Sequence, residues 1–183
     1  MSAMTTRAPL ASHGRRIRSA GAARPRPDGV AVSPAIGPLP AIYVPAHIGG
    51  TLPATPVDLR YSKDHLWVRP SPGTGLARIG VTDFAQQSLG DVVEVTLPRP
   101  GNTVNAGEAC GDIESVKSVS DLIAPVTGTV RTRNDDLASA PELVNTDPYG
   151  QGWMFEAEID SSALNEQLAS LMDAGAYRSM AGA

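Results

Sequence analysis

The stretch of residues 111–130 constrains the fold of this chain more than any other part of it. Two short runs with partial apolar alternation lie on either side of Lys117, with polar residues between the apolar ones. Alternation with a period of two predicts β-strands, so the pattern predicts a β-hairpin with Lys117 at or near its turn. Proline and glycine in residues 124–128 predict a second turn, after which residues 129–130 begin another strand. A lysine at a hairpin tip extends away from the fold, and we expect little stability to depend on it.

Lys117 has two interpretations from residue type alone. The usual one is a solvated charge in a polar turn. The chain contains only two lysines, Lys63 and Lys117, and thirteen arginines, so arginine supplies nearly all of its positively charged side chains. A lysine ε-amine can be acylated to a stable amide, whereas an arginine guanidinium cannot. The rarity of lysine therefore favours an attachment site without deciding between the two interpretations.

The chain from about residue 57 onward shows short apolar runs separated by turn signals. We expect strands at 66–68, 76–81, 91–97, 110–115 and 153–159, turns at 70–73, 100–102 and 105–107, and a short helical or turn connection at 134–144. Asp83 and Gln86 have the spacing of a capping box, which predicts a short helix that Gly90 ends with a positive φ.

A terminal helix is predicted near the end of the chain, capped by Ser161 or Ser162. Its apolar stripe is expected to pack on the sheet and consists of Leu164, Leu168, Leu171 and Met172. The single cysteine, Cys110, excludes an intramolecular disulfide and is interpreted as a small core residue. His65 has no acidic or cysteine neighbours at metal-ligand spacing, so we interpret it as a structural or surface histidine.

The first 55 residues differ in composition from the rest. Residues 1–55 are rich in Ala, Pro, Gly, Ser and Arg, with six arginines and one acid, and their lack of periodicity predicts a disordered extension. A mitochondrial transit peptide and a start-site artefact are the alternatives left open. Residues 56–183 form the predicted folded domain and carry nine basic and eighteen acidic residues. This acidic balance argues against binding to nucleic acid or to an anionic membrane.

Four motifs along the chain match, in order, the motifs of one known family. The central one is Glu-Ser-Val-Lys-Ser-Val-Ser-Asp at 114–121, followed by Ala-Pro-Val-Thr-Gly at 124–128. It resembles the lipoyl-attachment segment of the glycine cleavage system H protein family. The others resemble the family's first strand, its helix with the following strand, and its late signature, at residues 61–68, 80–93, 141–145 and 147–153. Together they cover about residues 57–178.

This resemblance implies a mainly β fold of the lipoyl/biotinyl type. The fold would be a flattened β-barrel or hybrid sandwich with short helices and a C-terminal helix. It also implies that Lys117 carries (R)-lipoate as N6-lipoyllysine and that the chain is a cytoplasmic, non-catalytic carrier, with the mitochondrial matrix as the alternative location. The arm would take the aminomethyl group of glycine from the decarboxylating P protein to the folate-dependent T protein, and the L protein, a dihydrolipoyl dehydrogenase, would reoxidise it. Lipoate-attaching enzymes are further expected partners.

Several nearby polar residues have weaker assignments. Glu114 and Asp121, with Asp64 and Ser88, are candidates for recognition of the modification site or for a cleft that shelters the arm, and no metal site is expected. The family commonly has an acid directly before the strand's tryptophan, where this chain has Leu66, so sheltering from that position is in doubt.

Two other functions stay open at this point. A biotin carrier resembles the same architecture, but such domains usually place methionine on both sides of the lysine, where this chain has Val116 and Ser118. The other is a β-sandwich adaptor in which Lys117 carries nothing. The acids around the hairpin, Asp112 among them, are more simply a solvated face than an acid/base pair, and the chain has no nucleophile-elbow, phosphate-loop or dinucleotide motif.

Overall fold

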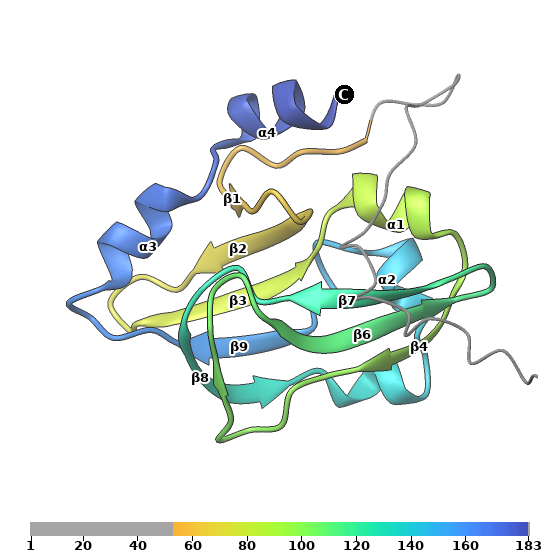
Figure 1. The fold of residues 1–183 in the computed structure, drawn as a ribbon, viewed down its shortest axis with the longest axis horizontal. Helices are drawn as coiled ribbons and strands as arrows, with labels where there is room; N and C mark the ends of the chain where they lie inside the picture. Colours follow the sequence, from red (N-terminus) through yellow and green to blue (C-terminus); the bar gives the residue numbers. More distant parts are fainter. Residues whose placement is uncertain (1–52, 183) are drawn as a thin grey trace, which may run out of the picture. The chain divides into compact units, whose positions relative to one another are not determined.

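The computed structural model describes residues 53–182, and the account below concerns these residues. They form nine strands and five short helical segments (Figure 1). The strands are β1 Arg60–Tyr61, β2 Leu66–Pro70, β3 Leu76–Val81, β4 Val92–Thr96, β5 Thr103–Val104, β6 Ala109–Ser115, β7 Val119–Ile123, β8 Gly128–Arg133 and β9 Phe155–Glu158. The helices are α1 Asp83–Leu89, the 3-10 turn η1 Asp135–Ala138, α2 Leu143–Thr146, α3 Leu164–Ser170 and α4 Ala174–Ala181.

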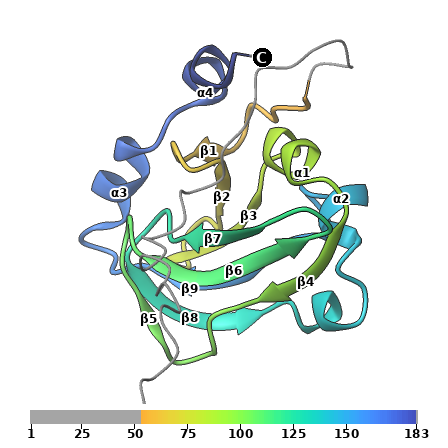
Figure 2. The same cartoon turned by 45° about the vertical axis from the view of Figure 1, so that its right-hand side comes forward.

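The strands form two antiparallel sheets. The larger has the order β1-β2-β3-β9-β8-β5 and the smaller the order β4-β6-β7. In Figures 1 and 2 the smaller sheet lies across one face of the larger, and the sheets do not merge into a closed ring. Of the two architectures expected from the resemblance, the sandwich is therefore confirmed and the barrel is wrong.

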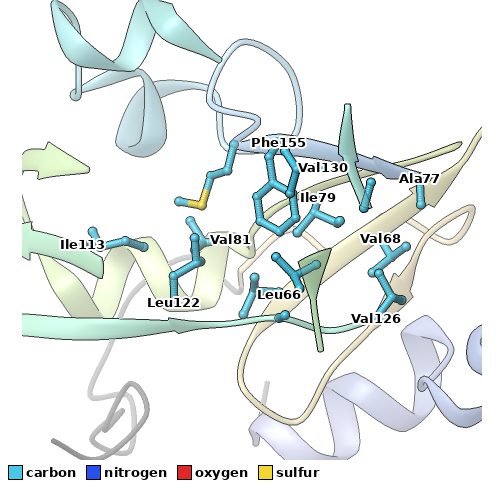
Figure 3. Packing of buried hydrophobic residues seen from close by; sticks show 14 of the residues in the cluster. Leu66, Val68, Ala77, Ile79, Val81, Ile113, Leu122, Val126, Val130 and Phe155 are labelled. Carbon is cyan, nitrogen blue, oxygen red and sulfur yellow. The ribbon is translucent and has the colours of Figure 1, made fainter. Parts of the chain in front are cut away.

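The main hydrophobic core fills the space between the sheets (Figure 3). Val68 and Ile79 come from the larger sheet and Ile113 and Leu122 from the smaller, and all four side chains have 0% exposure. Leu66 joins them from β2 at 1% exposure. Because β-strand side chains alternate between faces, Trp67 points to the opposite side of the larger sheet. There it forms a second cluster with Leu59, Tyr61, Ala174 and Tyr177.

The end of the described chain departs from the predicted single helix. The cap of α3 is Ala163, whose side chain makes no capping bond, so the prediction of Ser161 or Ser162 is wrong. The Ser162 amide and hydroxyl both donate to Asp160 Oδ1, at 2.8 and 2.5 Å, and the serine is thereby committed to a turn. Leu171 is the last cap residue of α3, and Asp173 begins a further helix, α4, by accepting a bond from Ala176 N.

The predicted apolar stripe is divided between the two clusters. Leu164, Leu168 and Leu171 pack partly buried against the main core, as expected. Met172 instead packs on the second cluster and pairs with Tyr61 through the backbone. The stripe therefore stabilises the sheet, but the chain turns between its third and fourth members.

Helix α1 begins one residue earlier than the capping-box pattern predicts. Its cap is Thr82, whose hydroxyl accepts a 3.2 Å bond from Ala85 N, and Asp83 is already in the first turn. Asp83 instead accepts a 2.6 Å bond from the Gln86 side chain. The predicted end is confirmed, since Gly90 has a φ of 75°. No helix in residues 53–182 combines the length and apolar character needed to cross a bilayer.

Candidate functional site

The predicted hairpin around Lys117 is present. Strands β6 and β7 pair antiparallel, with Glu114 opposite Val119 and Ile113 opposite Ser120, which leaves residues 116–118 as the turn. Ser115 closes this turn: its amide donates to Ser118 O at 2.8 Å, and its hydroxyl accepts from Ser118 N at 3.2 Å. Because Ser115 is only 5% exposed, the turn has a fixed base, and Lys117 stands at its tip.

The Lys117 side chain is exposed. None of the four ion pairs formed by residues 53–182 includes it. Its Cε and Nζ lie 3.7 and 3.8 Å from the point that a Cβ on Gly90 would occupy, so the side chain runs beside the end of α1. Within the described part of the chain, the other lysine, Lys63, is paired with Asp64 at 3.1 Å.

Apolar side chains surround the lysine turn. Val116 and Val119, on either side of Lys117, are 69% and 44% exposed, and Val93 at the irregular point of the β4–β6 pairing is 47% exposed. Three of the five large hydrophobic residues that the structure shows exposed therefore lie in or beside this hairpin. Exposed apolar side chains grouped in one region are typical of surfaces that contact other proteins.

The register brings two of the four weaker candidates onto the face of the smaller sheet that turns away from the core. Glu114 lies opposite Glu94 and Val119, and Asp121 lies opposite Asp112. Directly opposed residues share a face of the sheet. Ile113, which lies between Asp112 and Glu114 in β6, is buried on the opposite face. Glu114 and Asp121 are thus on the same surface as the lysine hairpin.

Asp64 and Ser88 are engaged elsewhere. Asp64 lies in the β1–β2 turn and forms its ion pair with Lys63. The Ser88 hydroxyl donates a 2.9 Å hydrogen bond to Phe84 O within α1. Position 66, where the family commonly has an acid, faces the main core, and Leu66 there is 1% exposed. In this chain the side chain at position 66 therefore contributes to the core, and the doubt about sheltering from that position stands.

The histidine and the cysteine both have structural surroundings. His65 is buried with a φ of 63°, and its Nδ1 is 2.8 Å from the Tyr177 hydroxyl. Desolvation lowers the pKa of His65, which keeps the ring neutral, although Asp64 opposes the shift. Cys110 packs partly buried against the main core, and burial raises the pKa of its thiol to about 12. Both predictions of a structural role are confirmed.

Residues 53–182 contain no group of three His, Cys, Asp or Glu side chains that could hold a metal ion. The arrangement they do present is an exposed primary amine on a rigid turn. Such an amine fits a covalent amide to an acyl group, because Lys117 is exposed among the described residues and an arm attached to it could extend away from the surface. One feature was missed from the sequence: Lys117 and Gly90 belong to separate motifs but lie close together, and no local pattern signals it.

Comparison with known proteins adds three findings. Residues 59–182 match the family model described as glycine cleavage H-protein. A glycine cleavage system H protein of Mycobacterium avium strain 104 is 53% identical to this chain over 124 residues, which cover 67% of this chain and 93% of the relative. A glycine cleavage system H protein of Mycobacterium tuberculosis strain CDC 1551 is 52% identical over 126 residues, which again cover 67% of this chain and 93% of the relative. The crystal structure of a glycine cleavage system H protein from Mycobacterium marinum superposes with a TM-score of 0.63 at 39% identity, covering 70% of this chain and 99% of that one.

Proposed function

Because this chain belongs to the glycine cleavage H-protein family, we propose that Lys117 is the residue that bears the family's covalent lipoate, as N6-lipoyllysine. The protein is the lipoyl-carrying shuttle of the glycine cleavage system, and it is a carrier component rather than a catalytic enzyme. Family membership decides against the biotin carrier and the adaptor. The observation that supports Lys117 is its exposure at the tip of a closed turn.

The chain's own residues have the task of placing the arm. When bound, lipoate supplies a dithiolane whose sulfur carries the aminomethyl group of glycine, so the reactive chemistry belongs to the cofactor. Ser115 fixes the turn beneath Lys117, and the paired strands β6 and β7 hold that turn to the sandwich. A rigid base and a flexible tether give the arm a high effective concentration at each enzyme that the protein meets.

The protein works with partner proteins of the glycine cleavage system in glycine catabolism. The proposed partners are the P protein that loads the arm, the T protein that unloads it, the L protein that reoxidises it, and a lipoate-attaching enzyme. Val93, Val116 and Val119 give these enzymes an apolar surface around the lysine. Glu114 and Asp121 are the proposed recognition residues on that surface, because they share it with the hairpin. Asp64 and Ser88 are weaker proposals, since both already have partners.

We further propose a cytoplasmic location, which is supported by the bacterial origin of the relatives. The proposed domain boundary at residues 55 and 56 falls near the start of the described chain, and the disordered extension at 1–55 falls almost entirely outside it. Contacts extend slightly beyond the boundary, because Ala54 N donates to Asp83 Oδ2 at 2.7 Å.

Mass spectrometry tests the assignment of Lys117. The protein is purified from lipoate-supplied cells, and intact mass and peptide mapping locate the lipoyl group in the wild type, in Lys117→Arg and in the matched control Lys63→Arg. We expect modification at Lys117 in the wild type and control and none in Lys117→Arg. The exposed substitution should change the free energy of unfolding by less than about 0.5 kcal/mol. A lipoyl group on Lys63, or on neither lysine, would overturn the assignment.

A further inference from the structure

We propose that Asn145 is a positioning residue for Lys117, acting through the loop between α1 and β4. This inference rests on the proposed function, because it takes Lys117 as the attachment residue. Asn145 belongs to the late sequence signature and lies in α2, far along the chain from the lysine. The argument follows hydrogen bonds from Asn145 to the loop and from the loop to the lysine turn.

Asn145 directs its whole side-chain amide at the end of α1 and the loop that follows. Its Oδ1 accepts a 2.9 Å bond from Val92 N. Its Nδ2 donates to Gly90 O at 2.9 Å and to Gln86 Oε1 at 3.1 Å. The two backbone bonds bracket Asp91, so the amide holds the loop on both sides of that residue. With both Nδ2 donors and the Oδ1 acceptor engaged, Asn145 links two segments more than fifty residues apart.

The stapled loop in turn supports the lysine turn through a backbone bond. Val116 N donates a 3.1 Å bond to Asp91 O, the residue that the staple brackets. Within residues 53–182, this is the one backbone hydrogen bond that joins the turn residues 116–118 to a segment outside the hairpin. Gly90 of the same loop lies near the lysine, whose Cε and Nζ are 3.7 and 3.8 Å from the position that a Cβ on Gly90 would occupy. In Figures 1 and 2 the hairpin turn lies at the same end of the sandwich as α1 and α2.

Asn145 itself is held in place by close backbone packing. A Cβ on Gly152 would lie 2.5 Å from Leu143 O and 2.9 Å from both Asp147 O and Val144 Cα, so only glycine lets this segment approach α2 so closely. Val144, the neighbour of Asn145, is fully buried in the main core. The late signature is therefore closely packed and fixes the position of Asn145. Through its hydrogen bonds to the α1–β4 loop, Asn145 restricts the motion of the lysine turn.

The test compares Asn145→Ala with Gln167→Ala in the full chain. Gln167 is the matched control, because its side-chain amide also bridges backbone groups of a distant segment: its Oε1 accepts from Thr127 N at 2.7 Å and its Nε2 donates to Thr127 O at 3.2 Å. Neither of these bonds involves α2 or the α1–β4 loop. Two readouts are needed: hydrogen exchange of the Val116 amide, and the kcat and KM for attachment of lipoate by a purified lipoate-protein ligase.

In Asn145→Ala we expect hydrogen exchange of the Val116 amide to accelerate by about tenfold or more. Local opening of the turn then no longer has to break the hydrogen bonds by which Asn145 holds the loop. The ligase KM should rise by about fivefold with little change in kcat, since the competent arrangement of the turn is populated for less of the time. Gln167→Ala should leave Val116 exchange and KM within about twofold of the wild type, whatever its effect on thermal stability. Unchanged Val116 exchange in Asn145→Ala, or equal effects on KM in both variants, would overturn the proposal.

Two provisions keep the outcome decisive. If Asn145→Ala does not fold, Asn145→Asp serves instead, because it keeps an acceptor for Val92 N and removes both Nδ2 donors. If the ligase does not modify wild-type Lys117, the proposed function fails by itself. The exchange readout still decides whether Asn145 holds the turn, because it needs no lipoate.

Discussion

Gly80 has no room for a side chain, because the indole of Trp67 covers it. The two residues are directly opposed in β2 and β3. A Cβ on Gly80 would lie 2.6, 2.7 and 2.9 Å from Cζ2, Cε2 and Nε1 of the indole. Trp67 is 0% exposed, and its Nε1 donates a 3.0 Å bond to Pro148 O in the late signature. The ring therefore cannot move aside without disturbing the bond that ties this signature to the sheet.

We expect Gly80→Ala to lower the free energy of unfolding by about 2–4 kcal/mol. Overpacking a buried site costs about 1–3 kcal/mol. Weakening the buried indole hydrogen bond adds about 1 kcal/mol. In a domain of this size each kcal/mol lowers Tm by about 3–5 °C, so Tm should fall by about 6–20 °C.

A double-mutant cycle with Trp67→Phe separates this contact from other effects of the alanine. Phenylalanine lacks the indole nitrogen and is smaller, so it leaves space where the new methyl group would lie. In the Trp67→Phe background, Gly80→Ala should therefore cost at least about 1 kcal/mol less than in the wild type. Thermal unfolding followed by circular dichroism measures all four proteins. Equal costs in the two backgrounds would refute the reasoning, because they would show that the alanine does not meet the indole.

Two further predictions concern pH and the start of the domain. The pKa of His65 is lower in the folded protein than in the unfolded chain. As the pH falls below 6.5, the unfolded chain therefore binds more protons than the folded protein. The stability that the neutral ring contributes is complete above pH 6.5 and is lost progressively below it. His65→Asn, which tolerates the positive φ, should flatten this fall in urea unfolding at pH 5–7, and an unchanged slope would count against the assignment. A chain that starts at Pro53 should have a free energy of unfolding within about 0.5 kcal/mol of that of the full chain. In a chain that starts at Val57 the free energy of unfolding should be about 1–3 kcal/mol lower, because the Tyr149 hydroxyl no longer donates to Ala54 O. Equal thermal stability of the two shortened chains would contradict this.

Features that depend on neighbouring residues could be predicted from the order of residues alone. The lysine hairpin, the turn at 124–128 and the strands at 66–68 and 76–81 are found where they were predicted. Alternation and turn residues are local signals, and the backbone responds to them within a few residues. The family followed from four such local motifs in order. The end of α1 at Gly90 is of the same kind, since a positive φ is a property of that residue.

Features that join distant segments could be known only from the packed structure. Met172, predicted in the stripe of a single helix, instead pairs with the backbone of Tyr61 and packs on the second cluster. Leu66 faces the core rather than an arm because the smaller sheet covers its side of β2. The hydrogen bonds from Asn145 to the α1–β4 loop, and from Asp91 of that loop to the lysine turn, join three motifs that lie far apart along the chain. Contacts of this kind depend on how the sheets and helices pack, so the spacing of residues along the chain cannot predict them.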